Sequence, residues 1–159
     1  MNKREYSVCF SGHRPEKLEI SENEVKKLLE QAIINSIKEG YTVFITGMAR
    51  GVDIWAAEIV LKEKKIYKNI ELICAVPVEG FENNRSEKER WIYNKIISEA
   101  NTVLYISSHY NKYCFQLRNK YMVDNSSKLI AVYNGSCGGT RNTINYAKKK
   151  GIKIESILK

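Results

Sequence analysis

The sequence predicts an α/β protein with a Rossmann-like, three-layer αβα architecture built around a mostly parallel sheet. Apolar runs typical of strands alternate with amphipathic helical patterns along the 159 residues. The run at residues 41–46 is continuous rather than alternating, as expected of a strand that is covered on both faces. Helices between successive strands act as crossover connections, so we expect parallel pairing with helices on both faces of the sheet.

The elements follow one another without a linker, a repeat or a low-complexity tract. Ser21 and Glu24 have capping-box spacing, and Asp53 is predicted to cap the second helix. Pro77 is predicted to close the third strand. The predicted strands are residues 6–10, 41–46, 70–76, 102–106, 128–133 and 152–157. The predicted helices begin at Ser21 and Asp53, cover residues 86–100 and 111–125, and run from Gly138 to about Gly151.

The composition narrows the function classes. With 26 basic and 18 acidic residues the net charge is +8, which favours an anionic partner. The lysines are spread over the predicted helices, and the only basic run, residues 148–150, is too short for a nucleic-acid arm. No apolar run approaches the ~18 residues that a membrane span needs, and no signal peptide is evident. We therefore expect one soluble, cytoplasmic domain over residues 1–159.

The four cysteines do not predict a metal centre or disulfides. Cys9 and Cys74 lie in apolar strand-like runs, where buried thiols are expected. No C-x-x-C spacing occurs, and only two histidines could supplement the thiols. We expect no metal, no cofactor and no disulfide in this chain.

Glycines and polar residues gather where the predicted parallel strands end. In such sheets ligands bind beyond the carboxyl ends of the strands, at a topological switch point. Glycine lets backbone N–H groups approach a phosphate, and the following helix adds its positive end. The Walker A and G-x-G-x-x-G spacings are absent, so ATP hydrolysis and NAD-dependent redox chemistry have no support. The candidate ligand-binding residues in these loops are Gly12, His13, Arg14, Gly47, Met48, Gly51, Asp53, Pro77, Gly138, Gly139 and Thr140.

A second cluster of candidates lies at residues 118–124. Arg118 and Asn119 are candidate ligand contacts, with the Arg118 guanidinium reaching an anionic group. The alternative is an ordinary amphipathic helix with a solvated arginine. His13 could act as an acid or base, or serve only as a structural hydrogen-bonding group. No residue is assigned a catalytic role.

Several segments together resemble the YspA-like branch of the SLOG superfamily. The matching segments are residues 9–18, 47–58, 118–124, 129–135 and 138–140. The superfamily includes the DNA-processing protein DprA, LOG-type phosphoribohydrolases and sensor domains for nucleotide-derived signals. The resemblance implies a Rossmann-like fold with a nucleotide-type pocket at the strand ends, and a homo-oligomer. Fold-level kinship alone does not determine function.

The sequence departs from the LOG enzymes at the residue that supports their chemistry. LOG enzymes carry a motif that resembles P-G-G-x-G-T-x-x-E. In this sequence Thr143 occupies the position of the glutamate of that motif. An oxocarbenium-like transition state would lack its stabilising anion. Residues 79–84 also lack the glutamine that is usual in this branch.

These observations favour binding over catalysis. We expect the protein to sense or sequester a nucleotide-derived small molecule, such as an ADP-ribose derivative or a cyclic nucleotide. A LOG-like N-glycosidic hydrolase is one alternative. A DprA-like nucleic-acid-binding module is another, although the sequence lacks a basic stripe and interleaved aromatics, so we do not expect nucleic acid as the partner.

Overall fold

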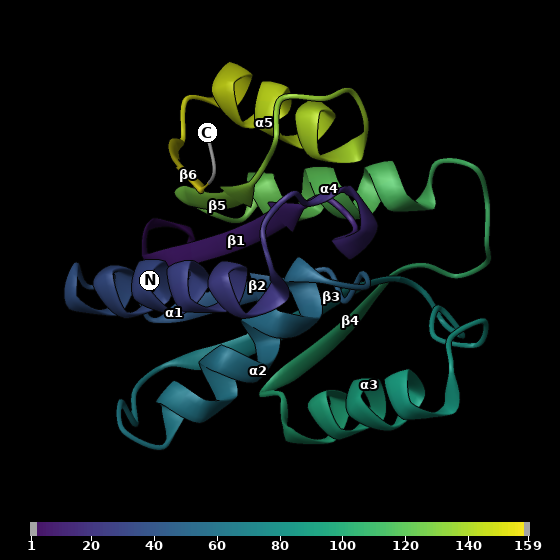
Figure 1. Cartoon of the computed structure of the whole chain (residues 1–159), viewed down its shortest axis with the longest axis horizontal. Helices are drawn as coiled ribbons and strands as arrows, with labels where there is room; N and C mark the ends of the chain where they lie inside the picture. Colours follow the sequence, from purple (N-terminus) through teal and green to yellow (C-terminus); the bar gives the residue numbers. More distant parts are fainter. Residues whose placement is uncertain (1–2, 158–159) are drawn as a thin grey trace.

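The computed structural model, which describes residues 3–157, has six parallel strands and five α-helices (Figure 1). The strand order is β4-β3-β2-β1-β5-β6, and every neighbouring pair is parallel. The predicted fold class is therefore confirmed, and the sheet is wholly parallel. The strands are β1 (Ser7–Gly12), β2 (Val43–Thr46), β3 (Glu71–Val78), β4 (Thr102–Ser107), β5 (Lys128–Val132) and β6 (Lys153–Ile157). The helices are α1 (Glu22–Lys38), α2 (Val52–Lys64), α3 (Glu87–Glu99), α4 (Cys114–Asp124) and α5 (Gly139–Lys150), with short 3-10 turns at Lys3–Tyr6 and Pro15–Lys17.

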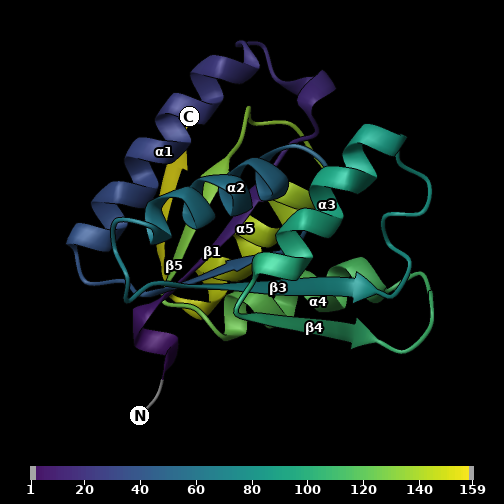
Figure 2. The ribbon, with the colours of Figure 1, turned by 90° about the horizontal axis from the view of Figure 1, so that it is seen from below.

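The helices form two layers on opposite faces of the sheet (Figures 1 and 2). Helices α1, α2 and α3 cover one face, and helices α4 and α5 cover the other. The larger core cluster, which includes Phe10, Leu29 and Phe44, lies beneath the first layer. The smaller one, which includes Cys9, Met122 and Leu129, lies beneath the second. The inner strands β1, β2, β3 and β5 are thus covered on both sides, which explains their continuous apolar runs.

Several predicted boundaries are corrected by the structure. Strand β3 continues through Pro77 to Val78. The pairing of β3 with β2 ends at Cys74 and Thr46, so Pro77 lies beyond that ladder and its missing N–H breaks no hydrogen bond to β2. The residue before α2 is Gly51 rather than Asp53, and α4 begins at Cys114 rather than at residue 111. Among the described helices, none is long and apolar enough to cross a membrane.

The helix-start signals also differ from the prediction. At α1 the Ser21 hydroxyl accepts from the Glu24 N–H, as predicted for one half of a capping box. The complete box lies at α3, where the Ser86 and Glu89 side chains each accept from the other residue's backbone N–H. Its S-x-x-E spacing is present in the sequence, but the helix was predicted from its apolar periodicity alone.

Candidate functional site

The sheet has its topological switch point between β1 and β5. These strands are paired in parallel from Val8 and Lys128 to Gly12 and Val132. The chain leaves β1 toward α1 on one face and leaves β5 toward α5 on the opposite face (Figure 2). The loops after β1 and β5 therefore diverge, which is the arrangement that opens a ligand-binding crevice in doubly wound folds.

His13 lies at this switch point. Its backbone N–H donates to Val132 O at 3.2 Å, and its ring stacks on Tyr133 with the ring centroids 5.3 Å apart. The residue is 4% exposed, and its Nε2 atom has no hydrogen-bond partner among the described residues. Burial lowers the pKa of His13 below its ordinary value, the charge of Lys17 lowers it further, and the Asn134 side chain opposes the shift. A neutral imidazole with one buried and unpartnered nitrogen therefore lies against Tyr133, directly after the end of β5.

The loop between β5 and α5 exposes the backbone of two consecutive glycines. Gly138 has a φ of 139° and precedes the first residue of α5. A Cβ atom added at Gly138 or Gly139 would meet nothing within 4 Å, so both backbones border open space. The Asn134 side chain shapes the loop by accepting from the Ser136 N–H and hydroxyl at 2.9 and 2.8 Å. The free N–H groups of the first turn of α5 can receive an anion here.

The loop between β2 and α2 is held from beneath by buried charges. Arg118 donates to Gly47 O, and Arg85 donates to Met48 O at 2.7 Å. The Asp53 carboxylate accepts from the Ala49 N–H at 3.1 Å. Met48 itself is fully buried and has a φ of 63°, a conformation that a non-glycine residue adopts only when its surroundings enforce it. The two guanidiniums provide that enforcement by binding the carbonyls on both sides.

The charges in this buried cluster do not cancel. Asp53, Arg85 and Arg118 are 6%, 9% and 5% exposed, and the Phe81 ring contacts both guanidiniums, with centroid distances of 4.8 and 5.9 Å. Burial raises the pKa of Asp53, and the charges of Arg118 and Arg85 oppose this rise. Burial lowers the pKa of Arg118, which Asp53 opposes. Two cations and one anion leave positive charge directly beneath the 47–51 loop.

The predicted site residues divide into an open group and an enclosed group. Two of the glycines are packed against a neighbouring side chain: a Cβ atom at the half-buried Gly12 would lie 2.4 Å from the Val52 side chain, and one at the buried Gly51 would lie 2.9 Å from Pro15. The Arg118 guanidinium is turned inward to Gly47 and Asn119, not outward to the sheet edge as predicted. The exposed or half-buried candidates are Gly12, Arg14, Asn119, Gly138 and Gly139, and the buried ones are His13, Gly47, Met48, Gly51, Asp53, Pro77, Arg118 and Thr140.

Residues 8–157 match the YspA SLOG family. The chain belongs to this family. A UPF0398 protein of Bacillus cereus is 30% identical over 155 residues, covering 91% of this chain and 83% of the relative. The SPbeta prophage-derived protein YoqJ of Bacillus subtilis is 33% identical over 124 residues, covering 70% of this chain and 72% of the relative.

The fold also resembles two solved DNA processing A proteins. The Helicobacter pylori protein, solved for its single-stranded DNA binding mode, matches with a TM-score of 0.66 and 19% identity over 94% of this chain. DprA from Streptococcus pneumoniae matches with a TM-score of 0.57 and 14% identity over 98% of this chain. This chain spans 64% and 60% of the two DprA chains, so the likeness concerns one part of each. At these identities it shows a shared fold.

Membership in the SLOG family directs attention to Thr143, the position of the LOG glutamate. Thr143 is 2% exposed, and its hydroxyl donates to Gly139 O at 2.9 Å within the first turn of α5. Helix α5 contains no acidic residue. The residue therefore stabilises the start of the helix that borders the crevice.

Three residues that shape this candidate site are absent from the candidates named from the sequence. Arg85 lies in the irregular segment between β3 and α3, where no periodicity indicates burial. Tyr133 ends an apolar run and was assigned to a strand, yet it stacks on His13. Arg50 joins two walls of the site by pairing with Glu89 at 3.0 Å and Glu16 at 3.7 Å. The glycines around Arg50 indicated a loop, but no sequence signal indicated its carboxylate partners.

Proposed function

We propose that this protein binds a nucleotide-derived small molecule, such as an ADP-ribose derivative or a cyclic nucleotide, in the strand-end crevice and leaves it chemically intact. The observation that carries the proposal is the buried His13 ring, whose Nε2 has no partner among the described residues, beside the open Gly138–Gly139 backbone. A ligand oxygen or ring nitrogen would complete the hydrogen bonding of that imidazole.

The electrostatics of the site support an anionic ligand. The α5 N-terminus and the uncompensated guanidinium charge beneath the 47–51 loop both favour negative charge at the same sheet edge. Arg14 is exposed on the loop after β1 and is free to neutralise a phosphate. Phosphates bound through backbone N–H groups, with a base or ribose near His13, would use these features together.

Binding is favoured over glycosidic hydrolysis by the placement of the acidic groups. Thr143 replaces the LOG glutamate, and the Asp53 carboxylate is held beneath the 47–51 loop by the Ala49 N–H and the charge of Arg118. A hydrolase needs a carboxylate that can reach the reacting sugar. The protein would therefore sense or sequester its nucleotide-derived ligand.

Nucleic acid is the second candidate ligand. The Helicobacter pylori structural neighbour binds single-stranded DNA, which argues against our expectation that nucleic acid is not a partner. The likeness is one of fold, so it does not transfer the partner to this chain. It does make nucleic acid a ligand class that the binding experiments must include.

Calorimetry with Gly139→Val and Gly139→Ala tests the proposed site. ADP-ribose, cyclic nucleotides and nucleoside monophosphates would be titrated into each protein, with mass spectrometry of the recovered ligand. A Cβ atom at Gly139 meets nothing within 4 Å, so the valine should block backbone approach and lower affinity at least about tenfold while the melting curve is unchanged. The alanine variant should lose less affinity. Equal affinity for all three proteins, or steady wild-type conversion of a nucleotide, would overturn the proposal.

A further inference from the structure

The excess of basic over acidic residues lies entirely in the C-terminal part of the sequence. Residues 1–99 contain 16 basic and 16 acidic residues, so their formal net charge is zero. Residues 100–159 contain 10 basic and 2 acidic residues, which accounts for the whole net charge of +8. The lysines are spread along the chain, as the sequence analysis noted, but their compensating acids are not.

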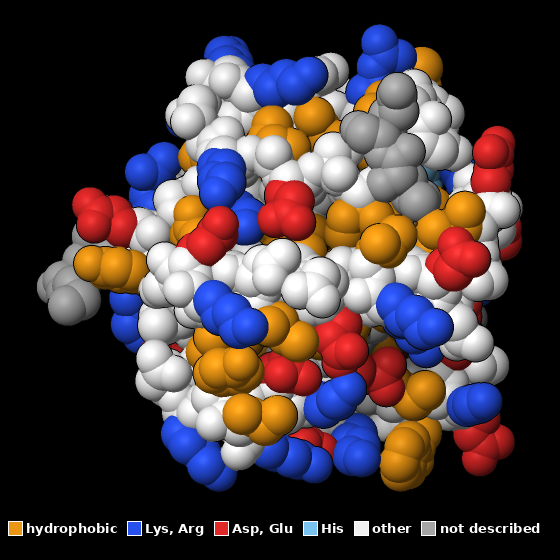
Figure 3. Space-filling model, turned by 60° about the vertical axis from the view of Figure 1, so that its left-hand side comes forward, with side chains coloured by type: hydrophobic (Ala, Val, Ile, Leu, Met, Phe, Trp, Pro, Cys, Tyr) orange, Lys and Arg blue, Asp and Glu red, His pale blue; other side chains and the backbone are white. Residues whose placement is uncertain are grey.

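Folding concentrates this excess on one layer of the molecule. Helices α4 and α5 both come from the charged part and lie side by side on one face of the sheet (Figure 1). On the face in Figure 3, by contrast, Lys and Arg side chains are interspersed with Asp and Glu side chains. A one-signed layer attracts polyanions over several ångströms, whereas an interspersed surface does not.

The two acidic residues of the C-terminal part are already engaged. Asp124 Oδ1 accepts from the Tyr146 hydroxyl at 2.8 Å and lies 3.7 Å from Lys150 Nζ. Glu155 lies 2.9 Å from Nζ of the buried Lys128. Among the described residues, Lys120, Lys148 and Lys149 of α4 and α5 therefore have no acidic partner.

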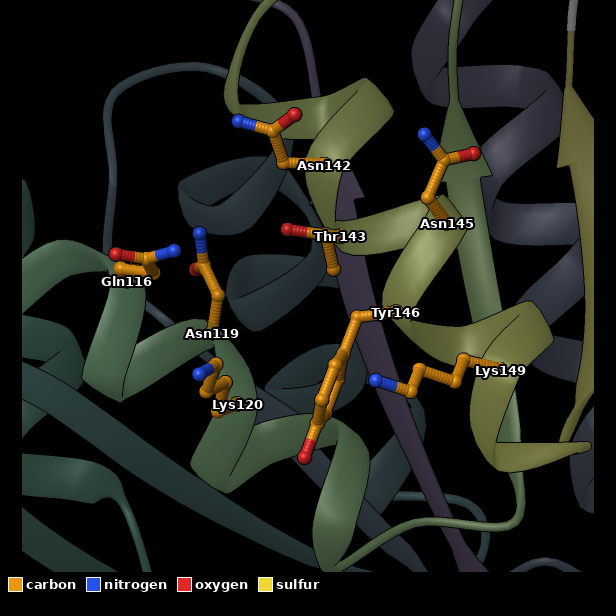
Figure 4. A pocket seen from close by; sticks show the side chains of 8 residues that line it. All are labelled: Gln116, Asn119, Lys120, Asn142, Thr143, Asn145, Tyr146 and Lys149. Carbon is orange, nitrogen blue, oxygen red and sulfur yellow. The ribbon is translucent and has the colours of Figure 1, made fainter.

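A groove of about 330 Å³ runs between α4 and α5 in the middle of this layer. In Figure 4, Gln116, Asn119 and Lys120 on α4 lie opposite Asn142, Thr143 and Tyr146 on α5. Of the lining side chains, four are carboxamides, two are lysines, and none is acidic. The lining residues are Gln116, Asn119, Lys120, Asn142, Thr143, Asn145, Tyr146 and Lys149.

The carboxamides have unused hydrogen-bonding capacity. The side chains of Gln116, Asn142 and Asn145 are exposed and form no hydrogen bond to another described residue. Asn119 accepts from Arg118 Nε at 2.8 Å, which leaves its NH₂ group available as a donor. Each such amide offers a donor and an acceptor together, the pairing that nucleobase edges require.

We propose that the α4–α5 groove binds single-stranded nucleic acid, at a surface separate from the strand-end crevice. Lys120 and Lys149 would neutralise phosphates, and the carboxamides would pair with base edges. Bases must be unpaired to enter a hollow between two helices, which disfavours a duplex. The side chains of an acidic protein segment offer only acceptors, whereas base edges offer donors and acceptors that match a carboxamide, which favours nucleic acid.

Fluorescence anisotropy with a labelled single strand of about 20 nucleotides tests this surface. Wild-type affinity should fall as salt rises. The double variant Lys120→Ala/Lys149→Ala removes two phosphate contacts, so the log–log salt slope should decrease in magnitude by about 1.4 and affinity at 0.1 M salt should fall about 25-fold. The double variant Gln116→Ala/Asn145→Ala should weaken binding at least about threefold while leaving the salt slope unchanged.

The matched control is Lys27→Ala/Lys68→Ala, which removes the same charge from exposed positions in the neutral part of the chain. It should change affinity less than about twofold. An equal loss in both lysine variants would overturn the proposal, because net charge alone would then explain binding. The proposal would also be overturned if polyglutamate competed as effectively as an unlabelled single strand. Failure of the wild-type protein to bind the labelled strand at about 0.05 M salt would overturn it as well.

Discussion

Gly47 and Arg118 are packed so closely that neither can be changed without affecting the other. A Cβ atom at Gly47 would lie 2.6 Å from Arg118 Nη1 and 2.8 Å from Asp53 Oδ2. The Arg118 guanidinium meanwhile donates to the Gly47 carbonyl. The glycine is thus explained by the two buried charged side chains beneath it, rather than by a phosphate above it.

Gly47→Ala should destabilise the fold. The added methyl group must displace two buried charged groups, which we expect to cost about 1–3 kcal/mol of unfolding free energy. Urea denaturation measures the change. Gly139→Ala is the control, because a Cβ atom at Gly139 meets nothing within 4 Å, and its stability should match or slightly exceed that of the wild type. Unchanged stability of the Gly47 variant would contradict this account of the loop.

Arg118→Ala should cost more, because it removes the donor to the buried Gly47 carbonyl and the positive charge near the buried Asp53 carboxylate. Losing a hydrogen bond from a charged group costs about 1.5–3 kcal/mol, and the less compensated Asp53 charge adds to this loss. Arg118→Lys should recover part of the loss, since a lysine keeps the charge without the planar fork. Lys120→Ala, on the exposed side of the same helix, should change stability by less than about 0.5 kcal/mol. A normally stable Arg118→Ala protein with weakened ligand binding would instead support the outward-facing arginine predicted from the sequence.

The fold could be predicted from the sequence because each strand and helix depends on local patterns. The apolar runs and the glycines at helix ends identify all six strands and all five helices, with boundary errors such as Pro77 and Cys114. The site was only partly predictable, because its geometry depends on contacts across long chain separations. Arg85 and Arg118 bind adjacent carbonyls at Gly47 and Met48, and no local pattern records that pairing.

The distribution of charge on the surface also could not be predicted from local sequence patterns. A net charge of +8 is a property of the composition, but its concentration on α4 and α5 appears only when charges are counted separately along the chain and placed on the fold. The α4–α5 groove likewise forms between two helices that are separated by β5 in the sequence.

The lowered pKa of His13 predicts a pH dependence of stability. Because the folded-state pKa lies below the ordinary value of 6.5, the unfolded chain binds more protons between these two values. The unfolding free energy should therefore rise with pH through that window and level off above about 6.5. Urea denaturation between about pH 5 and 8 should show this for the wild type. His13→Asn should remove that component of the slope, and an unchanged slope would show that the buried ring does not cause it.

Thr143 allows binding and hydrolysis to be distinguished by charge. Thr143→Glu places a carboxylate at a 2% exposed position, where burial raises its pKa and an anionic ligand is repelled. Thr143→Gln has nearly the same shape without the charge, so both variants should lose stability through overpacking and the lost bond to Gly139. Calorimetry should then show weaker ligand affinity for the glutamate variant than for the glutamine variant at pH 7, with the difference shrinking as the carboxyl is protonated at lower pH. Wild type and Thr143→Gln should return nucleotides intact after prolonged incubation. Equal affinities for the two variants would place the bound anion away from Thr143 and so away from the start of α5.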